Sequence, residues 1–489
     1  MKKIYFTISL LLCFTFHSFS EVKLASCYGE NMVLQRDQDI IIRGTSDPEE
    51  QIVVSFLDTK AETTADKEGR WNVRFDACPY GGPHQMIIKG ANNSIEFNNI
   101  LIGDVWLCSG QSNMVWSVGQ SANPEFEIAN ASYPHIRLFL TPGRWSFDPR
   151  HETSGSWNEC NSKNIQSFSA VAYFFAREIY LQTGIPQGLI CSAWGASEIE
   201  PWLSPKAIDN LDKELKDHYQ YTPENYPSKV KEILTRNPER IWDYNPNLYP
   251  GVLYNGMIHP FIGFRLKGIL WYQGENNAHV QRSDEYKFLF PVLINDWRER
   301  WGYELPFYWV QLPSYIPPSV PEGHISWTVL RESQHAALSL PQTGEAVTID
   351  IGDANDVHPR NKQDVGYRLA LIALNKLYGR NVIYSGPIYK SVRFQGNKAF
   401  LKFDCMGSCL SNRYPNGELK GFSIAGKDQV FEQAKAQVKN CNRLEIYSDK
   451  IKKPRYVRYA WENCPLEANL INTEGLPAAP FRTDHIPEK

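Results

Sequence analysis

A serine and a histidine, far apart in the chain, are the residues best placed by type and surroundings for nucleophilic chemistry. Ser112 lies in the cluster GQSNM over residues 110–114, and His358 ends a polar cluster that begins at Asp353. A histidine within reach of a serine hydroxyl takes its proton, and the serine oxygen then attacks a carbonyl carbon. The pair predicts acyl transfer, with Ser112 as nucleophile and His358 as general base. The simpler role for Ser112 is a helix N-cap.

Acyl transfer also needs hydrogen-bond donors for the oxyanion that develops on the carbonyl. We expect three of them: the backbone N–H of Ser112 at the start of a helix, the backbone of Gly195, and the side-chain amide of Gln273. Gly195 follows the apolar run 188–192, and Gln273 follows the apolar run 267–272. Asn276 and Asn277 are the alternative amide donors.

The group that orients His358 is open between two carboxylates. Asp356 stands two residues before the histidine and shares its loop, whereas Asp353 stands five before and could instead cap the turn through its own backbone. A carboxylate on Nδ1–H fixes the tautomer and stabilises the imidazolium. Asp356 is the preferred third member of a triad, and a dyad oriented by the backbone is the alternative. His259, also followed by proline, precedes a strand-like run and is expected near the other edge of the sheet.

The elements that must position these residues alternate between strand and helix over residues 100–379. Strands are expected at 104–108, 188–192, 267–272, 307–312 and 346–352, and helices at 168–182, 285–301 and 364–379. This alternation predicts an α/β class with a mostly parallel sheet covered by helices on both faces. In such a sheet the carboxyl ends of the strands share one edge, so the four polar clusters should meet there.

Two β-rich regions flank this α/β domain. Short alternating runs split by turn residues over 21–99 are typical of a β-sandwich, and strand-like runs return over 380–489 as a second β-rich domain. A polar segment rich in proline and tyrosine, at about 205–249, is expected to be an insertion. It could wall the active site or extend into solvent.

The N-terminus and the charge balance bear on location and partners. Residues 1–20 have two lysines, an apolar run and small residues at the end, which is typical of a signal peptide cleaved after Ser20 in a secreted or periplasmic protein. No later run is long and apolar enough to span a bilayer. With Lys+Arg 51 and Asp+Glu 54, the chain lacks the basic surplus that nucleic-acid binding needs.

Nine of the ten cysteines remain once Cys13 leaves with the signal peptide, so at least one thiol is unpaired. Cys108 and Cys191 end apolar runs and are expected to be buried in strands. Four cysteines cluster near the C-terminus and could form bridges in an oxidising compartment: Cys405, Cys409, Cys441 and Cys464. A zinc site at Cys405 and Cys409 is the competing interpretation.

Six motifs, in this order, carry a resemblance to a known family. They are IGDVW (102–106), GQSNM (110–114), LYNGMIHP (253–260), WYQGE (271–275), DVHP (356–359) and NKQDVG (361–366). Together they resemble the SGNH/GDSL hydrolase superfamily, and their wording is similar to the sialate O-acetylesterase family. The resemblance covers the chain from about residue 21 onward. It implies an SGNH-type three-layer α/β/α catalytic domain with flanking β-domains, and no metal or cofactor.

The resemblance also implies an activity, namely hydrolysis of O-acetyl esters of sugars, above all O-acetylated sialic acid, through an acetyl-Ser112 intermediate. Two motifs depart from the superfamily pattern. Asn276 falls at the superfamily's usual Asn position, although related carbohydrate esterases use the glutamine of a QGE motif, which favours Gln273. Asn355, three residues before His358, stands where the superfamily has its acid.

Glu275, Asn276 and Arg331 are the expected substrate-binding residues. A sialate carboxylate would pair with an arginine, and Arg282 and Arg360 also lie near the motif loops. The alternative functions are an acetyl esterase acting on acetylated xylan or another polysaccharide, and a non-catalytic carbohydrate-binding protein.

Overall fold

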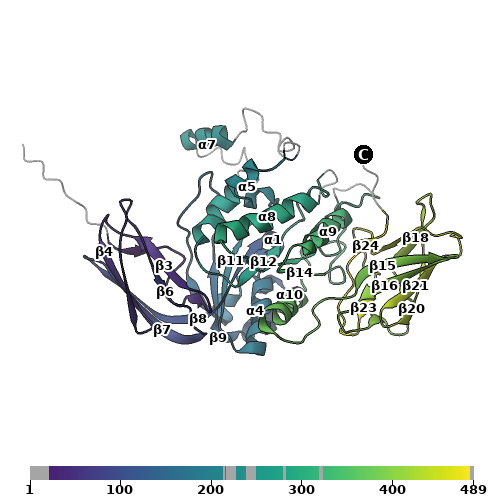
Figure 1. Ribbon diagram of the computed structural model, residues 1–489, viewed down its shortest axis with the longest axis horizontal. Coiled ribbons are helices and arrows are strands. Elements are labelled where there is room, and N and C mark those ends of the chain that lie inside the picture. Colours follow the sequence, from purple (N-terminus) through teal and green to yellow (C-terminus); the bar gives the residue numbers. More distant parts are fainter. Residues whose placement is uncertain are drawn as a thin grey trace, which may run out of the picture.

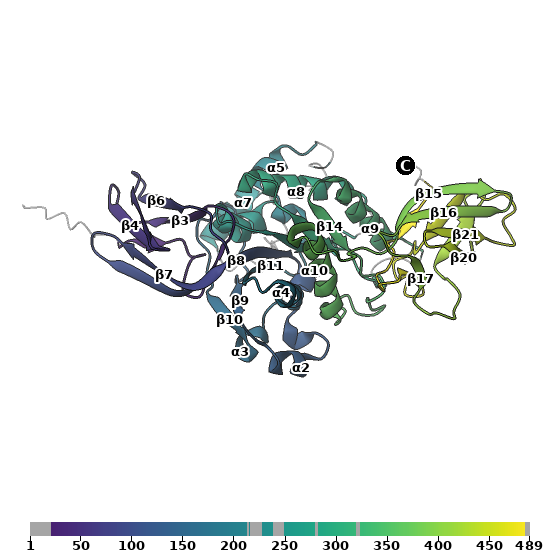
Figure 2. The same cartoon turned by 60° about the horizontal axis from the view of Figure 1, so that its bottom comes forward.

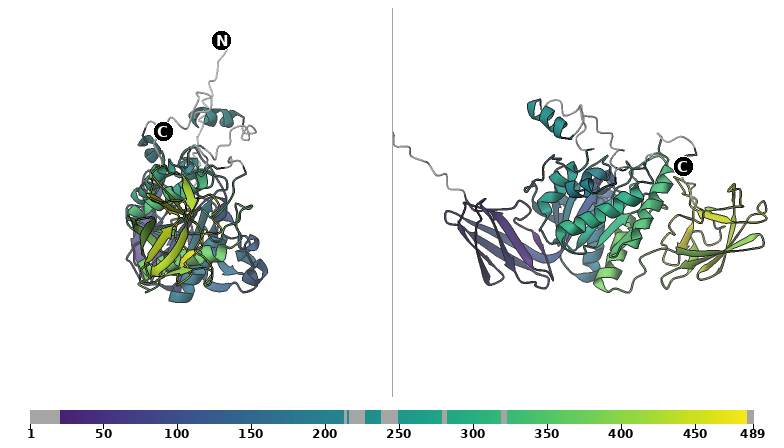
Figure 3. Two further views of the ribbon diagram at one scale, coloured as in Figure 1. Left: turned by 90° about the vertical axis from the view of Figure 1, so that its right-hand side faces the viewer. Right: turned by 45° about the horizontal axis from the view of Figure 1, so that its top comes forward.

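The computed structural model describes residues 21–212, 215, 227–237, 249–278, 282–318 and 323–484. Three regions lie in a row: an N-terminal β region, a central α/β region and a C-terminal β region (Figure 1). Figure 2 and the right-hand view of Figure 3 show the same order from other sides. The expected signal peptide lies outside the described residues.

A large mixed sheet forms the centre of the molecule. Its strands, in spatial order, are β10 (Trp157–Asn161), β9 (Ser132–Leu140), β11 (Gln187–Ala193), β8 (Ser94–Gly110), β12 (Gly268–Tyr272), β13 (Phe307–Val310) and β14 (Thr343–Ala346). All neighbouring pairs are parallel except β9 and β10. Every residue of β12, β13 and β14 is buried, as expected for strands covered on both faces.

Helices lie on both sides of this sheet. Figure 1 shows α4 (Ala170–Thr183) and α10 (Lys362–Tyr378) on one side, where they pack together, and α8 (Tyr286–Trp301) with α9 (Ser326–Ala336) on the other. The side chains of Ser169 and Asn361 cap the N-termini of α4 and α10. Shorter helices are α1 (Ser112–Val115), α2 (Pro124–Ala129), α3 (Ser162–Ile165), α5 (Pro205–Asp209) and α7 (Pro227–Arg236). Of the helices in the described ranges, none is long and apolar enough to cross a bilayer.

Strand β8 belongs to two regions at once. Its first half pairs with β7 (Gly81–Lys89) and its second half with β11 and β12, so the expected boundary at residue 99 falls inside one continuous strand. The chain turns to one side of β8 for β9 and β11, and to the other side for β12, β13 and β14. The carboxyl end of β8 is therefore the switch point of the sheet, where α/β proteins bind their ligands.

The last strand of the central sheet differs from the sequence-based prediction. A strand was expected over 346–352, but β14 ends at Ala346. Val347 and Ile349 instead pack into the core of the C-terminal β region. Their apolar character reflects burial against a second domain, which a single sequence does not distinguish from burial in a strand.

The N-terminal β region contains a three-stranded sheet and a set of strands joined to β8. The first comprises β1 (Lys23–Leu24), β3 (Ile40–Thr45) and β6 (Arg70–Phe75), and the second β2 (Val33–Gln35), β4 (Gln51–Phe56), β5 (Thr59–Thr64) and β7. On β4 and β6 buried and more exposed residues alternate, which explains the period of two in the sequence.

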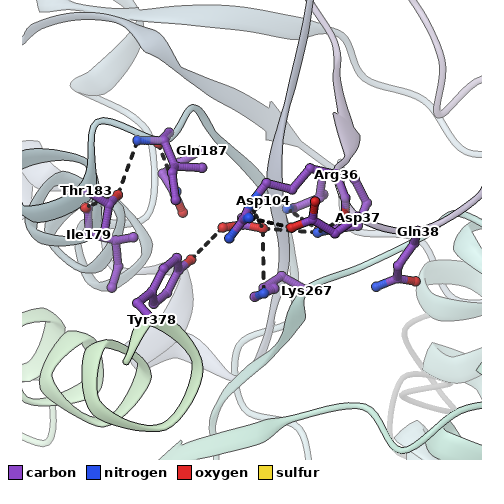
Figure 4. Close-up of polar contacts among 12 residues, drawn as sticks. Arg36, Asp37, Gln38, Asp104, Ile179, Thr183, Gln187, Lys267 and Tyr378 are labelled. Carbon is purple, nitrogen blue, oxygen red and sulfur yellow. Dashed lines mark hydrogen bonds and ion pairs between the residues drawn. The ribbon is translucent and has the colours of Figure 1, made fainter. Parts of the chain in front are cut away.

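One buried carboxylate joins the N-terminal β region to the central α/β region. Asp104 of β8 is fully buried and accepts hydrogen bonds from Gln35 Nε2 (3.0 Å), Arg36 Nε (3.0 Å) and the hydroxyl of Tyr378 at the end of α10 (2.8 Å). Figure 4 shows Arg36, Tyr378 and Lys267 around Asp104. A buried carboxylate with charged and neutral donors of this kind fixes the relative position of the parts that supply them.

The C-terminal β region has its own core and three small sheets. They are formed by β15 (Ile388–Gln395), β16 (Lys398–Asp404), β21 (Arg443–Tyr447) and β20 (Lys435–Asn440); by β19 (Phe431–Gln433), β18 (Phe422–Ala425), β22 (Tyr456–Tyr459) and β24 (Phe481–Arg482); and by β17 (Leu410–Asn412) with β23 (Leu470–Asn472).

The cysteines follow the expected division. Cys409 and Cys441 form a disulfide, which rules out the zinc interpretation of Cys409, while Cys405 and Cys464 are free. Cys108 and Cys191 are buried and face each other across β8 and β11, as predicted for strand cysteines.

Candidate active site

Ser112 lies at the switch point, immediately after β8. Gly110 has φ +132°, and a Cβ there would lie 2.1 Å from the carbonyl oxygen of Tyr272, so only glycine allows β8 to end this close to β12. The backbone N–H of Gln111 then donates to the same carbonyl at 2.9 Å. Helix α1 begins at Ser112 and spans only four residues, so its helix dipole adds little positive potential at the serine.

The structure brings Ser112 and His358 together from positions 246 residues apart in sequence. His358 Nε2 lies 2.8 Å from Ser112 Oγ. In the neutral tautomer with its proton on Nδ1, the imidazole accepts a hydrogen bond from the serine hydroxyl at Nε2. This is the contact that a general base makes with its nucleophile.

The imidazole of His358 is held by an aromatic ring that the sequence did not single out. Trp116 stacks on it, with ring centroids 4.5 Å apart and an interplanar angle of 13°. Trp116 follows Ser112 by one turn of chain and donates its Nε1–H to the carbonyl of Gln120 at 3.0 Å. The motif containing Ser112 therefore also orients the base. Because tryptophan is so often a core residue, its type alone gave no signal of this role.

The electrostatic surroundings of His358 favour its neutral form. Partial burial lowers its pKa below the usual value, and the ammonium of Lys362 lowers it further, while Asp356 acts in the opposite direction. A neutral imidazole is the form that accepts a proton, so these surroundings suit a base that works near neutral pH.

Asp356 does not make the hydrogen bond expected of a triad acid. Its Oδ1 accepts the backbone N–H of His358 at 2.8 Å and lies 3.9 Å from His358 Nδ1, beyond hydrogen-bonding distance. The side chain is 44% exposed. Asp353 is exposed and accepts the backbone N–H of Asn355, so it caps the turn. The geometry is that of a Ser–His dyad with a nearby carboxylate.

Gly195 lies next to Ser112, as expected. A Cβ at Gly195 would be 3.6 Å from the Cβ of Ser112, an ordinary contact, so the backbone of this loop runs alongside the serine. The following residue, Ala196, has φ +54°, a conformation that residues with a side chain adopt at some energetic cost and that recurs at functional sites.

The side chain of Gln273 is committed to other partners. Its Nε2 donates to the carbonyl of Ser197 (3.1 Å) and to Asn277 Oδ1 (2.8 Å), and its Oε1 accepts from Tyr286. Both amide hydrogens are used, and the residue is fully buried. This geometry does not support the expected oxyanion role of Gln273. It fits a residue that fixes the loop.

Asn276, the alternative amide donor, contacts the chain neighbours of both Ser112 and Gly195. Its Nδ2 donates to the carbonyl of Ala196 at 2.7 Å, and its backbone N–H faces Gln111 Oε1 at 3.5 Å. The side chain of Asn276 thus bonds to the loop that carries Gly195, and its backbone faces the residue before Ser112. One amide hydrogen is used on Ala196, and an amide nitrogen carries two.

Glu275 and Arg331, the expected substrate-binding residues, are both buried and bonded to other parts of the protein. Glu275 is buried, accepts from Asn113 Nδ2 at 2.5 Å, and has its pKa raised by burial. Arg331 is fully buried and donates to four backbone carbonyls, those of Leu312, Pro313, Glu462 and Asn463. The last two belong to the C-terminal region, so Arg331 joins two domains.

Two other arginines named from the sequence have different surroundings. Arg282 forms ion pairs with three carboxylates, those of Glu198, Glu200 and Glu285. Arg360 is exposed, two residues after His358. His259 Nδ1–H donates to the backbone carbonyl of Arg150 (2.7 Å), a contact separate from the Ser112–His358 pair.

A cleft of about 490 Å³ opens beside Trp194, in the loop after β11. Three aromatic residues line it, Trp145, Phe147 and Trp194. The charged residues of its lining are Arg144, Arg150, and Lys231 with its ion-pair partner Asp148. Trp194 directly precedes Gly195 in the chain, so one lining residue of the cleft is a neighbour of an expected oxyanion donor. Lys231 lies on α7, within the expected insertion, and α7 forms one wall of the cleft. The Nε of Arg150 is buried without a hydrogen-bond partner among the described residues.

Comparison with known proteins places this geometry in a family. Residues 235–374 match the profile of the family described as carbohydrate esterase, sialic acid-specific acetylesterase. The sialate O-acetylesterases of Mus musculus and Homo sapiens are each 30% identical to the chain over 94% of its length, and it covers 94% and 92% of theirs. A carbohydrate acetylesterase from Xanthomonas citri has a similar structure, with a TM-score of 0.86, 39% identity, and coverage of 95% of this chain and 100% of that one.

The protein is thus an esterase, of the class that hydrolyses O-acetyl groups on carbohydrates. More particularly, the chain belongs to the sialate O-acetylesterase family.

Proposed function

We propose that this esterase removes O-acetyl groups from sialic acid by a two-step acyl transfer on Ser112. The contact of 2.8 Å between His358 Nε2 and Ser112 Oγ is the observation that carries the mechanism. Neutral His358 accepts the serine proton as Oγ attacks the acetyl carbon, and the imidazolium then donates that proton to the departing sugar oxygen. Water attacks the acetyl-Ser112 ester, with His358 again as base, and acetate leaves.

The oxyanion donors in this proposal are the backbone N–H groups of Ser112 and Gly195 and the side-chain amide of Asn276. Asn276 replaces Gln273 because both amide hydrogens of Gln273 are donated elsewhere, whereas Asn276 lies between the two loops that flank Ser112. A single preorganised donor contributes about 10²–10³-fold to kcat in enzymes of this chemistry.

The cleft beside Trp194 supports an anionic sugar as the substrate. Indole and phenyl faces pack against the apolar face of a sugar ring, and arginine pairs with a carboxylate. Trp145, Phe147 and Trp194 supply the first kind of surface, and Arg144 and Arg150 the second. Sialic acid combines a sugar ring with a carboxylate, and relatives of this chain carry the name sialate O-acetylesterase.

The proposal includes an SGNH-type α/β/α catalytic domain and secretion after cleavage at Ser20. The helix pairs α4–α10 and α8–α9 on opposite sides of the sheet are compatible with the first. The apolar N-terminal run and the Cys409–Cys441 disulfide support the second, since disulfides persist in oxidising compartments.

The proposal is tested by measuring acetate release with the wild type and with Ser112→Ala. Both proteins are given O-acetylated sialic acid and, separately, acetylated xylan. The wild type should favour the sialic acid, and Ser112→Ala should lose about 10³-fold or more of its activity while folded. Mass spectrometry of quenched reactions should find one acetyl group on the peptide that contains Ser112. Faster release from xylan would overturn the substrate assignment, and an active Ser112→Ala protein would overturn the mechanism.

A further inference from the structure

A fully buried lysine lies next to the catalytic pair and takes no part in the acyl transfer above. Lys362 is the first residue of α10, and its side chain is inaccessible to solvent. Its Nζ donates to Asn113 Oδ1 at 2.5 Å and lies 5.3 Å from the centre of the Tyr272 ring. Asn113 directly follows the nucleophile, and Tyr272 ends the strand beside it.

Asn113 connects this lysine to three loops of the site. While its Oδ1 accepts from Lys362, its Nδ2 donates to Glu275 Oε1 at 2.5 Å and to the backbone carbonyl of Val357 at 2.9 Å. Val357 directly precedes His358. The one amide therefore ties the loop of the nucleophile to the loop of the base and to the loop after β12.

Packing does not explain an ammonium group at this position. A cation at a helix N-terminus faces the positive end of the helix dipole, and burial removes its hydration. Burial lowers the pKa of Lys362 to about 7, even though Glu275 opposes the shift. A methionine would fill a similar volume without either energetic penalty. We therefore look for a function of the positive charge itself.

The charge of Lys362 acts on His358. Two charged groups act on the imidazole: Lys362 from α10, which favours the neutral form, and Asp356 from the histidine's own loop, which favours the cation. On the side of α1 the imidazole meets Trp116 by stacking and Ser112 by its hydrogen bond, neither of which carries a charge. Burial of the ring acts in the same direction as Lys362.

We propose that Lys362, held by Asn113 between the loops of Ser112 and His358, is a positioning residue that keeps His358 in its proton-accepting form as the pH falls. The proposal rests on the proposed function only in taking His358 as the general base. It concerns the pH range in which the enzyme works, and it assigns Lys362 no contact with substrate.

The sign of the expected effect follows from the two charges. Below about pH 7 Lys362 carries its proton, and this is also the range in which His358 titrates. Removing the positive charge of Lys362 lets the imidazole protonate at higher pH, so the acid limb of the kcat/KM profile moves to higher pH. Removing the negative charge of Asp356 moves the acid limb to lower pH.

The experiment compares pH profiles of kcat/KM for hydrolysis of an aryl acetate by the wild type, Lys362→Met, Lys362→Arg and Asp356→Asn. We expect the acid limb of Lys362→Met to move up by roughly half a pH unit or more, equivalent to about a threefold loss on that limb. Lys362→Arg keeps the charge and should keep the wild-type limb, whatever its kcat. Asp356→Asn should move the limb in the opposite direction. A Lys362→Met profile that falls in kcat at every pH without moving its limb would overturn the proposal, because a purely structural lysine behaves that way.

The Lys362→Met protein could fail to fold because the buried Glu275 loses its neighbouring positive charge. In that case the double variant Lys362→Met/Glu275→Gln, which removes both charges, takes its place. Its acid limb should also move to higher pH. Ser112→Ala, measured in parallel, separates two kinds of failure. An active Ser112→Ala protein would refute the proposed function, whereas an inactive one beside an unmoved limb in the lysine variant would refute only this inference.

Discussion

The carboxylate of Asp356 accepts the backbone N–H of His358 at 2.8 Å but lies 3.9 Å from the imidazole Nδ1 of the same residue. It shapes the loop that carries the base, and it influences the charge on the ring only through space. Where a buried carboxylate binds Nδ1–H directly, its loss can lower kcat by about 10⁴-fold.

Asp356→Asn should therefore lower kcat modestly, by about tenfold or less, since an amide oxygen can still accept the backbone N–H and no Nδ1 hydrogen bond is lost. Steady-state kinetics of Asp356→Asn beside Asp353→Asn checks this, with little change expected in the second because Asp353 caps an exposed turn. A drop of several orders of magnitude confined to Asp356→Asn would restore the triad.

The wild-type pH profile has a predicted position. Because burial and Lys362 lower the pKa of His358 below 6.5, kcat/KM should stay high from neutral pH down to that lowered pKa and then fall as the imidazole protonates. A profile measured with an aryl acetate from about pH 4 to 9 gives the position of the limb. An acid limb above pH 6.5 would contradict the conclusion that burial and Lys362 together outweigh Asp356 in setting the pKa of His358.

Asn276 and Gln273 should respond differently to substitution. Asn276→Ala is expected to lower kcat about 10²–10³-fold with a smaller change in KM and little loss of stability, as for a lost oxyanion donor. Gln273→Met leaves buried partners unsatisfied and should lower the free energy of unfolding by about 1–3 kcal/mol. Urea denaturation beside kinetics separates the two. A stable Gln273→Met protein with a loss confined to kcat would return the donor role to Gln273.

Arg331 is expected to matter for stability. Arg331→Met leaves four backbone carbonyls without their donor, at the junction between α9 and the C-terminal region. We expect a loss of about 3 kcal/mol or more in the free energy of unfolding, since each unsatisfied buried group costs about 1–3 kcal/mol. KM of the remaining folded enzyme should be unchanged. An increase in KM at full stability would revive its assignment to substrate binding.

Arg150 offers a test of the anionic sugar. Arg150→Met should raise KM for O-acetylated sialic acid about tenfold or more through loss of a charged contact, while leaving hydrolysis of an uncharged aryl acetate unaltered. Arg360→Met, at an exposed position, is the matched comparison. Equal effects on both substrates would show that Arg150 supports the loop structurally instead of binding a carboxylate.

The sequence predicted the elements that carry strong periodicity. Strands β8, β11, β12 and β13 and helices α4, α8 and α10 lie where their apolar runs indicated, because each buries a continuous surface in the central region. The run at 346–352 was misassigned, since Val347 and Ile349 are buried by a different domain. A one-dimensional pattern records that a residue is buried, but not against which partner.

The pairing of Ser112 with His358 was also predicted, although the strand before His358, β14, ends at Ala346 and a longer loop carries the histidine to Ser112. The finer contacts were not. Asn276 and Gln273 are both amides in one loop, and only the direction of each side chain tells them apart. Arg331 was assigned to substrate on residue type alone, and its four carbonyl partners come from segments up to 132 residues away.

The sharing of β8 between two sheets has a consequence for synthesis of the chain. Its first half finds β7 and β2 among residues already made, and β11 pairs with its second half some eighty residues later. The edge that receives β12 must wait until residue 272 emerges from the ribosome. Until then the strand leading to Ser112 exposes an unpaired apolar edge, and such edges recruit wrong partners. Because β7 and β2 pair with the first half of β8, we expect the N-terminal β region to hold that strand extended and to act as a template on which the central sheet forms.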